Sequence, residues 1–226
     1  MSKIEVKGLS KKIKDNIILD NINVSFEGGN IYGIYGRNAS GKTMFFRAIC
    51  GLIKPDEGQV VINNRILGKD IDFPESCGVM LESPGFWKEY SAFENLKQLS
   101  KIKNIINDEQ IRDVINKVGL NCDDKKIFGK FSLGMKQKLG IAQALMEMPE
   151  ILILDEPTNA LDDVSINNIR KIIKEQKERG AIVLIASHNK DDINELADVK
   201  LKMNQGKLSL VWGVKWLREH ENIYIW

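Results

Sequence analysis

The sequence has few cysteines and no long hydrophobic run. Its 226 residues include three cysteines, which are widely spaced and form no CxxC pair. Neither a disulfide framework nor a zinc site is therefore indicated, and a reducing compartment fits best. The longest apolar runs, residues 151–154 and 181–186, are too short to span a bilayer, and the first residues contain no apolar signal core. We expect a chain that is soluble or peripheral to a membrane.

An excess of charge of one sign is also absent. The 33 lysines and arginines nearly balance the 31 aspartates and glutamates, which leaves a formal net charge of +2. Nucleic-acid-binding domains usually concentrate positive charge, so no nucleic-acid partner is expected. With 43% hydrophobic and 28% charged residues, the chain can bury a full core, as one large domain or as a domain with an inserted lobe.

The apolar pattern predicts strands and helices in an order typical of a parallel α/β fold. Near the amino terminus, Ile22, Val24 and Phe26 alternate as in a half-buried strand, and residues 31–36 (IYGIYG) read as a buried strand. Residues 84–148 have a helical pattern, so we expect them to form an inserted lobe. The expected helices cover residues 41–50, 108–118, 163–179 and 191–196, and a capping box lies at residues 91–94.

Residues 36–43 (GRNASGKT) match the phosphate-binding pattern GxxxxGK[ST] and lie between a predicted strand and a predicted helix, as the pattern requires. The glycines let backbone N–H groups and the positive end of the helix face the phosphates of a nucleotide. Lys42 is expected to reach the β- and γ-phosphates, and the Thr43 hydroxyl to bind Mg²⁺. The alternative is an ordinary glycine-rich turn, but a chance match has a probability of about one in a hundred. The predicted nucleotide-binding residues are Gly36, Asn38, Ala39, Ser40, Gly41, Lys42, Thr43 and Met44.

Two adjacent carboxylates follow the apolar run at 151–154. Asp155 can face a metal ion and Glu156 can face an attacking water. A pair of solvated acids at a strand end is the alternative, and the phosphate-binding loop earlier in the chain is what favours the catalytic interpretation. His188 ends another apolar strand and is a candidate sensor of the γ-phosphate, although an isolated histidine there is more often incidental.

The order of these motifs resembles that in the ATP-binding subunit of an ABC transporter, from about Ile4 to Leu208. FSLGMKQ, at residues 131–137, occupies the signature position of that family. NALD at 159–162 corresponds to its D-loop and His188 to its switch histidine. The resemblance implies an α/β fold with a P-loop NTPase core and a mostly parallel sheet, together with an N-terminal antiparallel β subdomain and an inserted α-helical subdomain.

The resemblance also implies that residues 1–226 form a single domain with three parts. The expected RecA-like core with its antiparallel part covers about 1–83 and 149–208, the helical subdomain with the signature about 84–148, and a C-terminal tail about 209–226.

Further site residues are implied by the resemblance. In the family, the signature helix contacts the γ-phosphate of ATP held by a second subunit, so Ser132, Gly134 and Asp162 are expected to complete the partner's site. Ser132 is also suited to be a plain helix N-cap. The implied catalytic residues are Glu156, His188 and Lys42, the implied metal ligands are Thr43, Asp155 and Glu82, and the implied cofactors are ATP and Mg²⁺.

Two positions depart from the general family pattern. Glu82 stands where the family usually has a glutamine, and the segment LESPGFW around it is similar to that of bacitracin- and lantibiotic-type exporters. Ile13 stands where an aromatic residue usually stacks on adenine, so the nucleobase preference stays open.

The function that we expect is that of an ATP-hydrolysing subunit. It would form a homodimer around two ATP molecules and drive a separate integral membrane permease at the inner face of the cell membrane, for export of a peptide antibiotic or similar compound. Phe86 and Trp87 are candidates for the permease contact or, equally, for the core. The alternatives are a soluble ABC-type ATPase acting on DNA or ribosomes, and a nucleotide-sensing module without catalysis.

Overall fold

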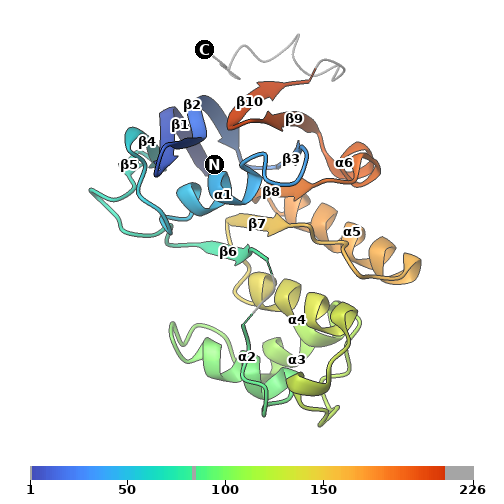
Figure 1. The fold of residues 1–226 in the computed structure, drawn as a ribbon. Coiled ribbons are helices and arrows are strands. Elements are labelled where there is room, and N and C mark those ends of the chain that lie inside the picture. Colours follow the sequence, from blue (N-terminus) through green and yellow to red (C-terminus); the bar gives the residue numbers. More distant parts are fainter. Residues whose placement is uncertain (1, 83–84, 212–226) are drawn as a thin grey trace.

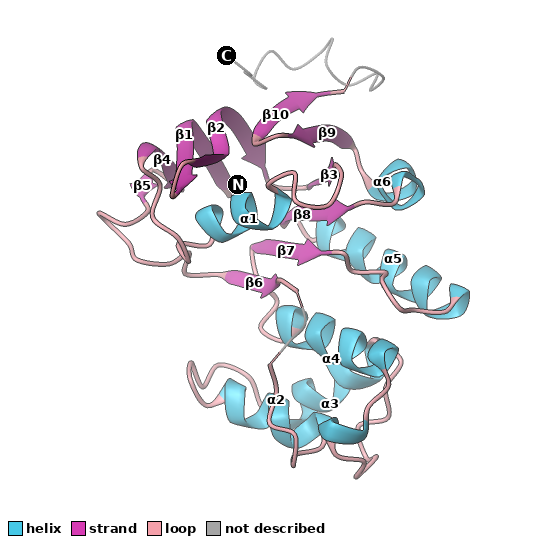
Figure 2. Ribbon diagram, viewed as in Figure 1, coloured by secondary structure: helices cyan, strands magenta, loops and turns pink. Residues whose placement is uncertain are grey.

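The computed structural model describes residues 2–82 and 85–211, and the statements that follow refer to these residues (Figures 1 and 2). The strands are β1 (Lys3–Ile13), β2 (Asn16–Glu27), β3 (Asn30–Tyr35), β4 (Glu57–Ile62), β5 (Arg65–Ile66), β6 (Cys77–Met80), β7 (Ile151–Asp155), β8 (Ile182–Ser187), β9 (Val199–Asn204) and β10 (Lys207–Leu210). The helices are α1 (Lys42–Ile49), α2 (Ala92–Ser100), α3 (Asp108–Lys117), α4 (Leu133–Leu145), α5 (Asp163–Glu178) and α6 (Lys190–Leu196), and a 3₁₀ turn covers Phe128–Lys130.

A six-stranded sheet with the order β10-β9-β3-β8-β7-β6 forms the centre of the protein. Its strands are parallel except for β10, which pairs with β9 in the antiparallel sense at one edge. Successive side chains of β7 enter two different apolar clusters: Ile151 and Ile153 on one face, Leu152 and Leu154 on the other. Because both faces are covered at this position, β7 is apolar from Ile151 to Leu154, as is usual for a central strand of a parallel sheet. The prediction of a parallel α/β core is confirmed.

A second sheet, with the order β2-β1-β4-β5, is antiparallel. The short strands expected near the amino terminus are one long hairpin, in which β1 and β2 pair from Lys3 opposite Glu27 to Ile13 opposite Asn16. Helix α1 contributes Phe45 and Phe46 to the apolar cluster shared by the two sheets. Burial of this cluster fixes α1, and hence the loop that precedes it, against the end of β3.

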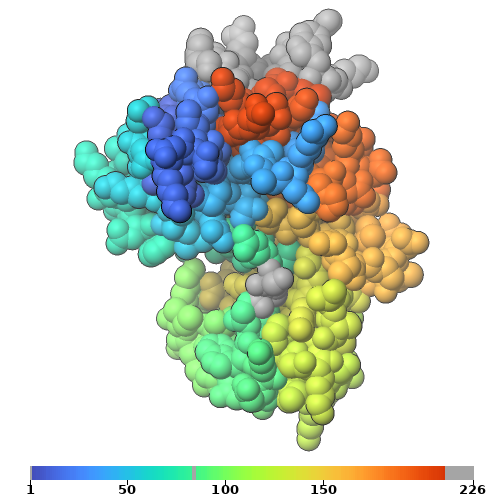
Figure 3. Space-filling view, in the orientation of Figure 1, coloured from blue at the N-terminus to red at the C-terminus, as the bar shows by residue number. Residues whose placement is uncertain are grey.

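Helices α2, α3 and α4 form the inserted lobe (Figure 3, green to yellow). The predicted capping box at Ser91 and Glu94 is present, and Asn107 and Gln110 form a second one that the sequence analysis did not identify. Helix α4 packs so closely on β6 that a Cβ at Gly78 would lie 1.8 Å from the carbonyl oxygen of Ala144. The close contact anchors the C-terminal half of α4 in the core, while its N-terminus lies in the lobe.

The boundaries differ slightly from those expected. Helix α1 begins at Lys42 with Gly41 as its N-cap, α5 ends at Glu178, and α6 begins at Lys190. Strand β10 runs to Leu210, and residues from 212 onward, most of the predicted tail of about 209–226, lie outside the described residues. None of the helices within residues 2–82 and 85–211 has the length and apolar character needed to span a bilayer.

Candidate active site

The loop between β3 and α1 forms the first part of the site. Gly41 has φ 111° and Ala39 has φ 60°, so the chain bends through left-handed conformations before the helix begins. A Cβ at Gly36 would lie 2.3 Å from the carbonyl oxygen of Met203, so no side chain fits at that position. Lys42 Nζ donates hydrogen bonds to the carbonyl oxygens of Gly36 at 2.9 Å and Arg37 at 3.3 Å. The Lys42 ammonium group therefore lies inside the loop that is predicted to bind the phosphates.

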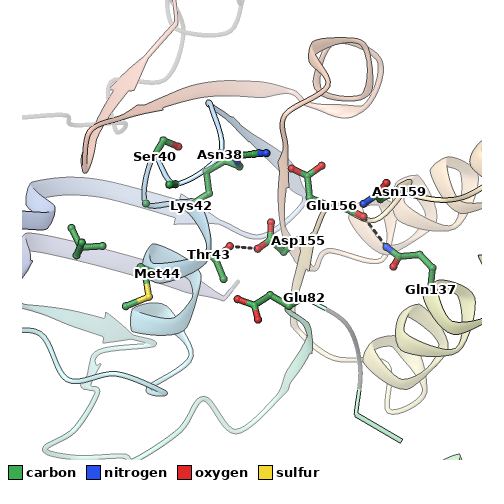
Figure 4. A pocket seen from close by; sticks show the side chains of 13 residues that line it. Asn38, Ser40, Lys42, Thr43, Met44, Glu82, Gln137, Asp155, Glu156 and Asn159 are labelled. Atoms are coloured by element: carbon green, nitrogen blue, oxygen red, sulfur yellow. Dashed lines mark hydrogen bonds between the residues drawn. The ribbon is translucent and has the colours of Figure 1, made fainter. Parts of the chain in front are cut away.

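A cavity of about 530 Å³ opens over this loop (Figure 4). It is lined by all the residues predicted to bind the nucleotide at this loop except Gly36, together with Glu82, Asp155 and Glu156. Ile18 of β2, Gln137 of α4 and Asn159 also line it. Gln137 and Asn159 belong to the signature and D-loop segments identified from the sequence, but none of the three was predicted as a site residue, and Ile18 lies in no motif. The residues come from segments far apart in the chain, which meet because β3 and β7 end at the same edge of the parallel sheet.

One buried polar atom in the loop has no partner. Ser40 is 7% exposed, and its Oγ makes no hydrogen bond within the described residues. A buried hydroxyl without a partner costs free energy, whereas an oxygen of a bound phosphate would satisfy it. The unpartnered hydroxyl, together with the N-terminus of α1, fits the binding of a nucleotide phosphate at this loop.

Thr43 and Asp155 connect the start of α1 to the end of β7. Thr43 Oγ1 donates a hydrogen bond of 2.5 Å to Asp155 Oδ2, as Figure 4 shows. Burial of Asp155 raises its pKa above the ordinary value, while the hydrogen bond from Thr43 acts in the opposite direction. A carboxylate that is costly to leave charged and buried is suited to a cation, and a hydroxyl with a carboxylate is an oxygen donor pair that Mg²⁺ accepts.

Glu82 lies at the same cavity, but its carboxylate has another partner. Glu82 Oε1 accepts a hydrogen bond of 3.1 Å from Arg47 Nη2 on α1, and Glu82 has φ 58°. Among the described residues, no group of three or more histidine, cysteine, aspartate and glutamate side chains is arranged to hold a metal ion. A metal at this site would therefore depend on Thr43, Asp155 and ligand oxygens, with Glu82 as a further donor.

Glu156 and His188 are brought into direct contact. The two Glu156 carboxylate oxygens lie 2.8 Å from His188 N and 2.8 Å from His188 Nδ1, and Ser187 Oγ donates to Oε2 at 3.2 Å. Gln137 Nε2 donates to the Glu156 carbonyl oxygen at 2.7 Å (Figure 4). Glu156 also lines a second cavity of about 610 Å³, which includes His188 but not Lys42. The side chain predicted to orient water is thus held by the side chain predicted to sense phosphate.

The three residues predicted to complete a partner's site, Ser132, Gly134 and Asp162, do not line the first cavity. Ser132 Oγ accepts a hydrogen bond of 3.2 Å from Met135 N, and Asp162 Oδ1 accepts one of 2.8 Å from Ser165 N. They are the N-caps of α4 and α5, so the N-cap interpretation of Ser132 is confirmed. The expected contact of Ser132, Gly134 and Asp162 with a nucleotide on a second subunit stays a prediction.

Comparison with known proteins gives a consistent family assignment. Residues 19–159 match the profile of the ABC transporter family. Over 205 residues, the chain is 51% identical to YybJ of Bacillus subtilis, described as an uncharacterized ABC transporter ATP-binding protein, with 91% of this chain and 94% of YybJ covered. It is 41% identical to the bacitracin transport ATP-binding protein BcrA of Bacillus licheniformis, with 91% of this chain and 68% of BcrA covered.

A further relative and two solved structures agree with this. The lantibiotic transport ATP-binding protein SrtF of Streptococcus pyogenes is 34% identical, with 92% of this chain and 89% of SrtF covered. An ATP-binding subunit of an ABC transporter superposes with a TM-score of 0.82 at 24% identity, covering 92% of this chain and 90% of that one. A dimeric bacterial ABC transporter cassette has a TM-score of 0.82 at 22% identity, covering 93% and 99%. These two structures establish the shared fold.

Proposed function

The chain belongs to the ABC transporter family of ATP-binding subunits and is an ATPase, and from that premise we propose that it drives a separate transmembrane permease. The observation that carries the catalytic part is the meeting of three groups at one sheet edge: the loop around Lys42, the Thr43–Asp155 pair and the Glu156–His188 pair. Nucleotide binding alone does not require a carboxylate that is held by a histidine beside the phosphate loop, whereas hydrolysis does require such a group to orient water.

The roles of the residues follow from their places in the cavity. Lys42 and the backbone of the loop bind the phosphates, and the free hydroxyl of Ser40 donates to a phosphate oxygen. Thr43 and Asp155 would hold Mg²⁺, which when bound neutralises charge on the phosphates. Glu156 accepts hydrogen bonds from the attacking water and orients it, while His188 holds the Glu156 carboxylate in place. Catalysis on this account rests on positioning and electrostatics.

A second copy of the chain would complete the nucleotide site with the N-terminus of its helix α4. Ser132 and Leu133, at the N-terminus of α4, are exposed, and the Leu133 side chain is 72% exposed. An exposed, positively polarised helix end suits the γ-phosphate of a nucleotide bound to another subunit. Because each chain carries both halves, a two-fold homodimer would hold two equivalent ATP molecules between its subunits.

The inserted lobe supplies a surface for the permease. Trp87 and Tyr90 are 49% and 37% exposed, and their rings lie 6.0 Å apart. Phe86 is instead partly buried: its ring lies 5.2 Å from that of Phe128 and packs against the core of the lobe, so the two residues that the sequence analysis treated together differ. Asn95, which is fully buried, hydrogen-bonds the backbone N–H and carbonyl of Trp87 and so fixes the backbone from which the exposed ring projects.

The names of the relatives support export of a peptide antibiotic or similar compound as the transport process. BcrA and SrtF are described as bacitracin and lantibiotic transport proteins, and the LESPGFW segment of this chain resembles that subgroup. Attachment to a permease would place the chain at the inner face of the cell membrane.

Co-purification tests this assignment. The chain, tagged at its N-terminus, is expressed in a host carrying its neighbouring membrane components, and membranes are solubilised in mild detergent with and without ATP. A polytopic membrane protein in stoichiometric amount, together with ATPase activity in the purified complex, is the expected result. Recovery with ribosomes or DNA alone would contradict the transport function and favour the soluble ABC-type ATPase.

A further inference from the structure

A second contact between the two catalytic segments lies next to the Glu156–His188 pair. Thr158 follows Glu156 by two residues, and its Oγ1 donates a hydrogen bond of 2.5 Å to Oδ2 of Asp192 on α6. The other carboxylate oxygen of Asp192, Oδ1, accepts a hydrogen bond of 2.6 Å from Arg170 Nη2 on α5. Thr158 is 8% exposed and Asp192 is 4% exposed. The buried carboxylate of Asp192 therefore has a donor on each oxygen, which compensates its charge.

Helix α6 is fixed firmly to the sheet. A Cβ at Gly33 in β3 would lie 2.7 Å from Ile193 Cγ2, so only a glycine lets α6 pack this closely. Arg170 also pairs with Glu195, one turn further along α6, and so joins α5 to α6 at two carboxylates. Asp192 is consequently attached to a rigid support next to the strand that leads into the phosphate loop.

The segment that carries Glu156 needs such a support. Glu156 has φ 52°, a left-handed conformation that a glutamate adopts only where surrounding contacts hold it. On one side, Gln137 binds the Glu156 carbonyl oxygen at 2.7 Å. On the other side, the Thr158–Asp192 bond holds the turn immediately after it. His188, the partner of the Glu156 carboxylate, lies four residues before Asp192 on the segment that leads into α6, so α6 is joined to the Glu156 turn through Asp192 and to His188 through the chain.

We propose that Thr158, Asp192 and Arg170 form a positioning network for ATP hydrolysis, in which Asp192 holds the turn of Glu156 at its working distance from His188. The proposal rests on the function proposed above for Glu156 and His188. None of these three residues lines the cavity around Lys42, whereas all three line the second cavity with Glu156 and His188. The network therefore acts on hydrolysis through other residues and leaves nucleotide binding largely unchanged.

The kinetic test compares matched variants of the full chain in complex with its permease. Thr158→Val removes the hydroxyl at nearly constant size, Thr158→Ser keeps it, and Asp192→Asn removes the charge. We expect kcat to fall about tenfold or more in Thr158→Val and Asp192→Asn, with KM for ATP within about twofold of the wild type, and Thr158→Ser to retain most of the activity. Asp113→Asn, at an exposed aspartate of α3 that lines neither of these two cavities, is the control and should leave kcat unchanged.

A readout without turnover separates positioning from general damage. The chain contains two histidines, so the ¹⁵N imidazole resonances of His188 can be assigned with His220→Gln. Thr158→Val and Asp192→Asn should move the His188 Nδ1 resonance toward its value in Glu156→Gln, in which the carboxylate contact is lost, while Asp113→Asn leaves it in place. Melting temperature reports whether each variant is folded.

Two results would overturn the network. The first is an unchanged His188 resonance and kcat in folded Thr158→Val, and the second is an equal loss in Thr158→Ser, because the hydroxyl would then not be the active group. Lack of hydrolysis in the wild-type complex would count against the proposed function instead, and the His188 resonance would still test the network.

Discussion

The Thr43 hydroxyl lies 2.5 Å from the Asp155 carboxylate and so joins the first residues after the phosphate loop to the end of the central strand β7. The two residues are 112 positions apart in the sequence. Asp155 is 6% exposed, so solvent compensates little of its charge, and the nearby cation that lowers its pKa is Lys42. The hydroxyl gives it one hydrogen bond, and a bound cation would compensate the rest.

The pKa of Asp155 leads to a prediction on stability and pH. Because burial raises this pKa above its ordinary value of 3.8, the folded chain binds the proton more tightly than the unfolded chain. The free energy of unfolding therefore decreases as pH rises from 3.8 through the raised pKa, and above both values the charged Asp155 is destabilising. Asp155→Asn should melt at a higher temperature than the wild type at pH 7 without nucleotide, and the difference should shrink as the pH is lowered toward 3.8.

The same variant should lose function while it gains stability. Without the carboxylate, Mg²⁺-dependent ATP binding weakens, which isothermal titration with and without Mg²⁺ would measure. Asp113→Asn, an exposed carboxyl on α3, is the control and should change neither quantity. A lower melting temperature for Asp155→Asn at pH 7 would show that the burial cost is outweighed by contacts of the charged form.

Replacement of Glu156 should separate binding from hydrolysis. Glu156→Gln keeps the size and a hydrogen-bonding oxygen but removes the charge that orients water, so kcat should fall by a factor of about 10² to 10⁴. ATP binding should be retained, because Lys42 and the loop are untouched. The ATP-bound dimer should then accumulate, as light scattering after size-exclusion chromatography would detect. Near-normal turnover would remove Glu156 from this role, and Lys42→Ala, which should lose ATP affinity, serves as the contrasting variant.

The nucleobase end of the site predicts weak base selectivity. Ile18 lines the cavity there, while Ile13, at the end of β1, is 44% exposed and is not among the lining residues. With no aromatic stack, GTP should compete with ATP within about tenfold. Ile13→Tyr should add stacking worth at most about 1–3 kcal/mol and strengthen ATP binding. Ile17→Tyr is the control, because successive strand residues point to opposite faces and Ile17 alternates with Ile18. A strong ATP preference in the wild type would mean that polar groups recognise the base.

The exposed ring of Trp87 predicts a partner contact. Trp87→Ala should weaken binding to the permease by about 2 kcal/mol, roughly thirtyfold, if Trp87 anchors the interface. Because Asn95 holds only the backbone of Trp87, the melting temperature of the isolated chain should change little. Phe86→Ala is the contrasting variant: it removes a core contact with Phe128 and should destabilise the chain itself. Equal destabilisation by both changes would place Trp87 in the core.

Sequence patterns predicted the parts of the site that depend on local order. The continuous apolar runs of β7 and β8 and the GxxxxGK[ST] loop place Lys42, Asp155 and Glu156 at one edge of a parallel sheet, because parallel strands end on the same side. The caps at Ser91 and Ser132 were visible because a cap and its partner lie three residues apart.

Contacts across the fold could not be predicted in this way. Gln137 reaches Glu156 from the lobe over 19 positions, and Arg170 reaches Asp192 over 22, and neither pair has a spacing that a local rule describes. The different burial of Phe86 and Trp87 likewise depends on which of the two rings packs on Phe128 in the folded lobe.

The contact between Gly134 and Ala160 predicts a coupling between the start of α4 and the turn that follows Glu156. A Cβ at Gly134 would lie 2.8 Å from the Ala160 carbonyl oxygen, so Gly134→Ala must push the two segments apart. The free energy of unfolding should decrease by about 1–3 kcal/mol, as urea denaturation would measure. ATP binding to the isolated chain should persist, because Gly134 does not line the cavity around Lys42.

Measurements of ATP-dependent dimerisation and of kcat in Gly134→Ala test whether the site is shared between two subunits. If the N-terminus of α4 meets the nucleotide of a second copy, ATP-dependent dimerisation should weaken more than the loss of stability explains. Gly85→Ala is the matched control, since a Cβ there would meet no atom of the described residues within 4 Å. Dimerisation and kcat that remain at the wild-type level in a folded Gly134→Ala chain would show that this helix end takes no part in the partner's site. ATP would then be held by the residues of a single chain.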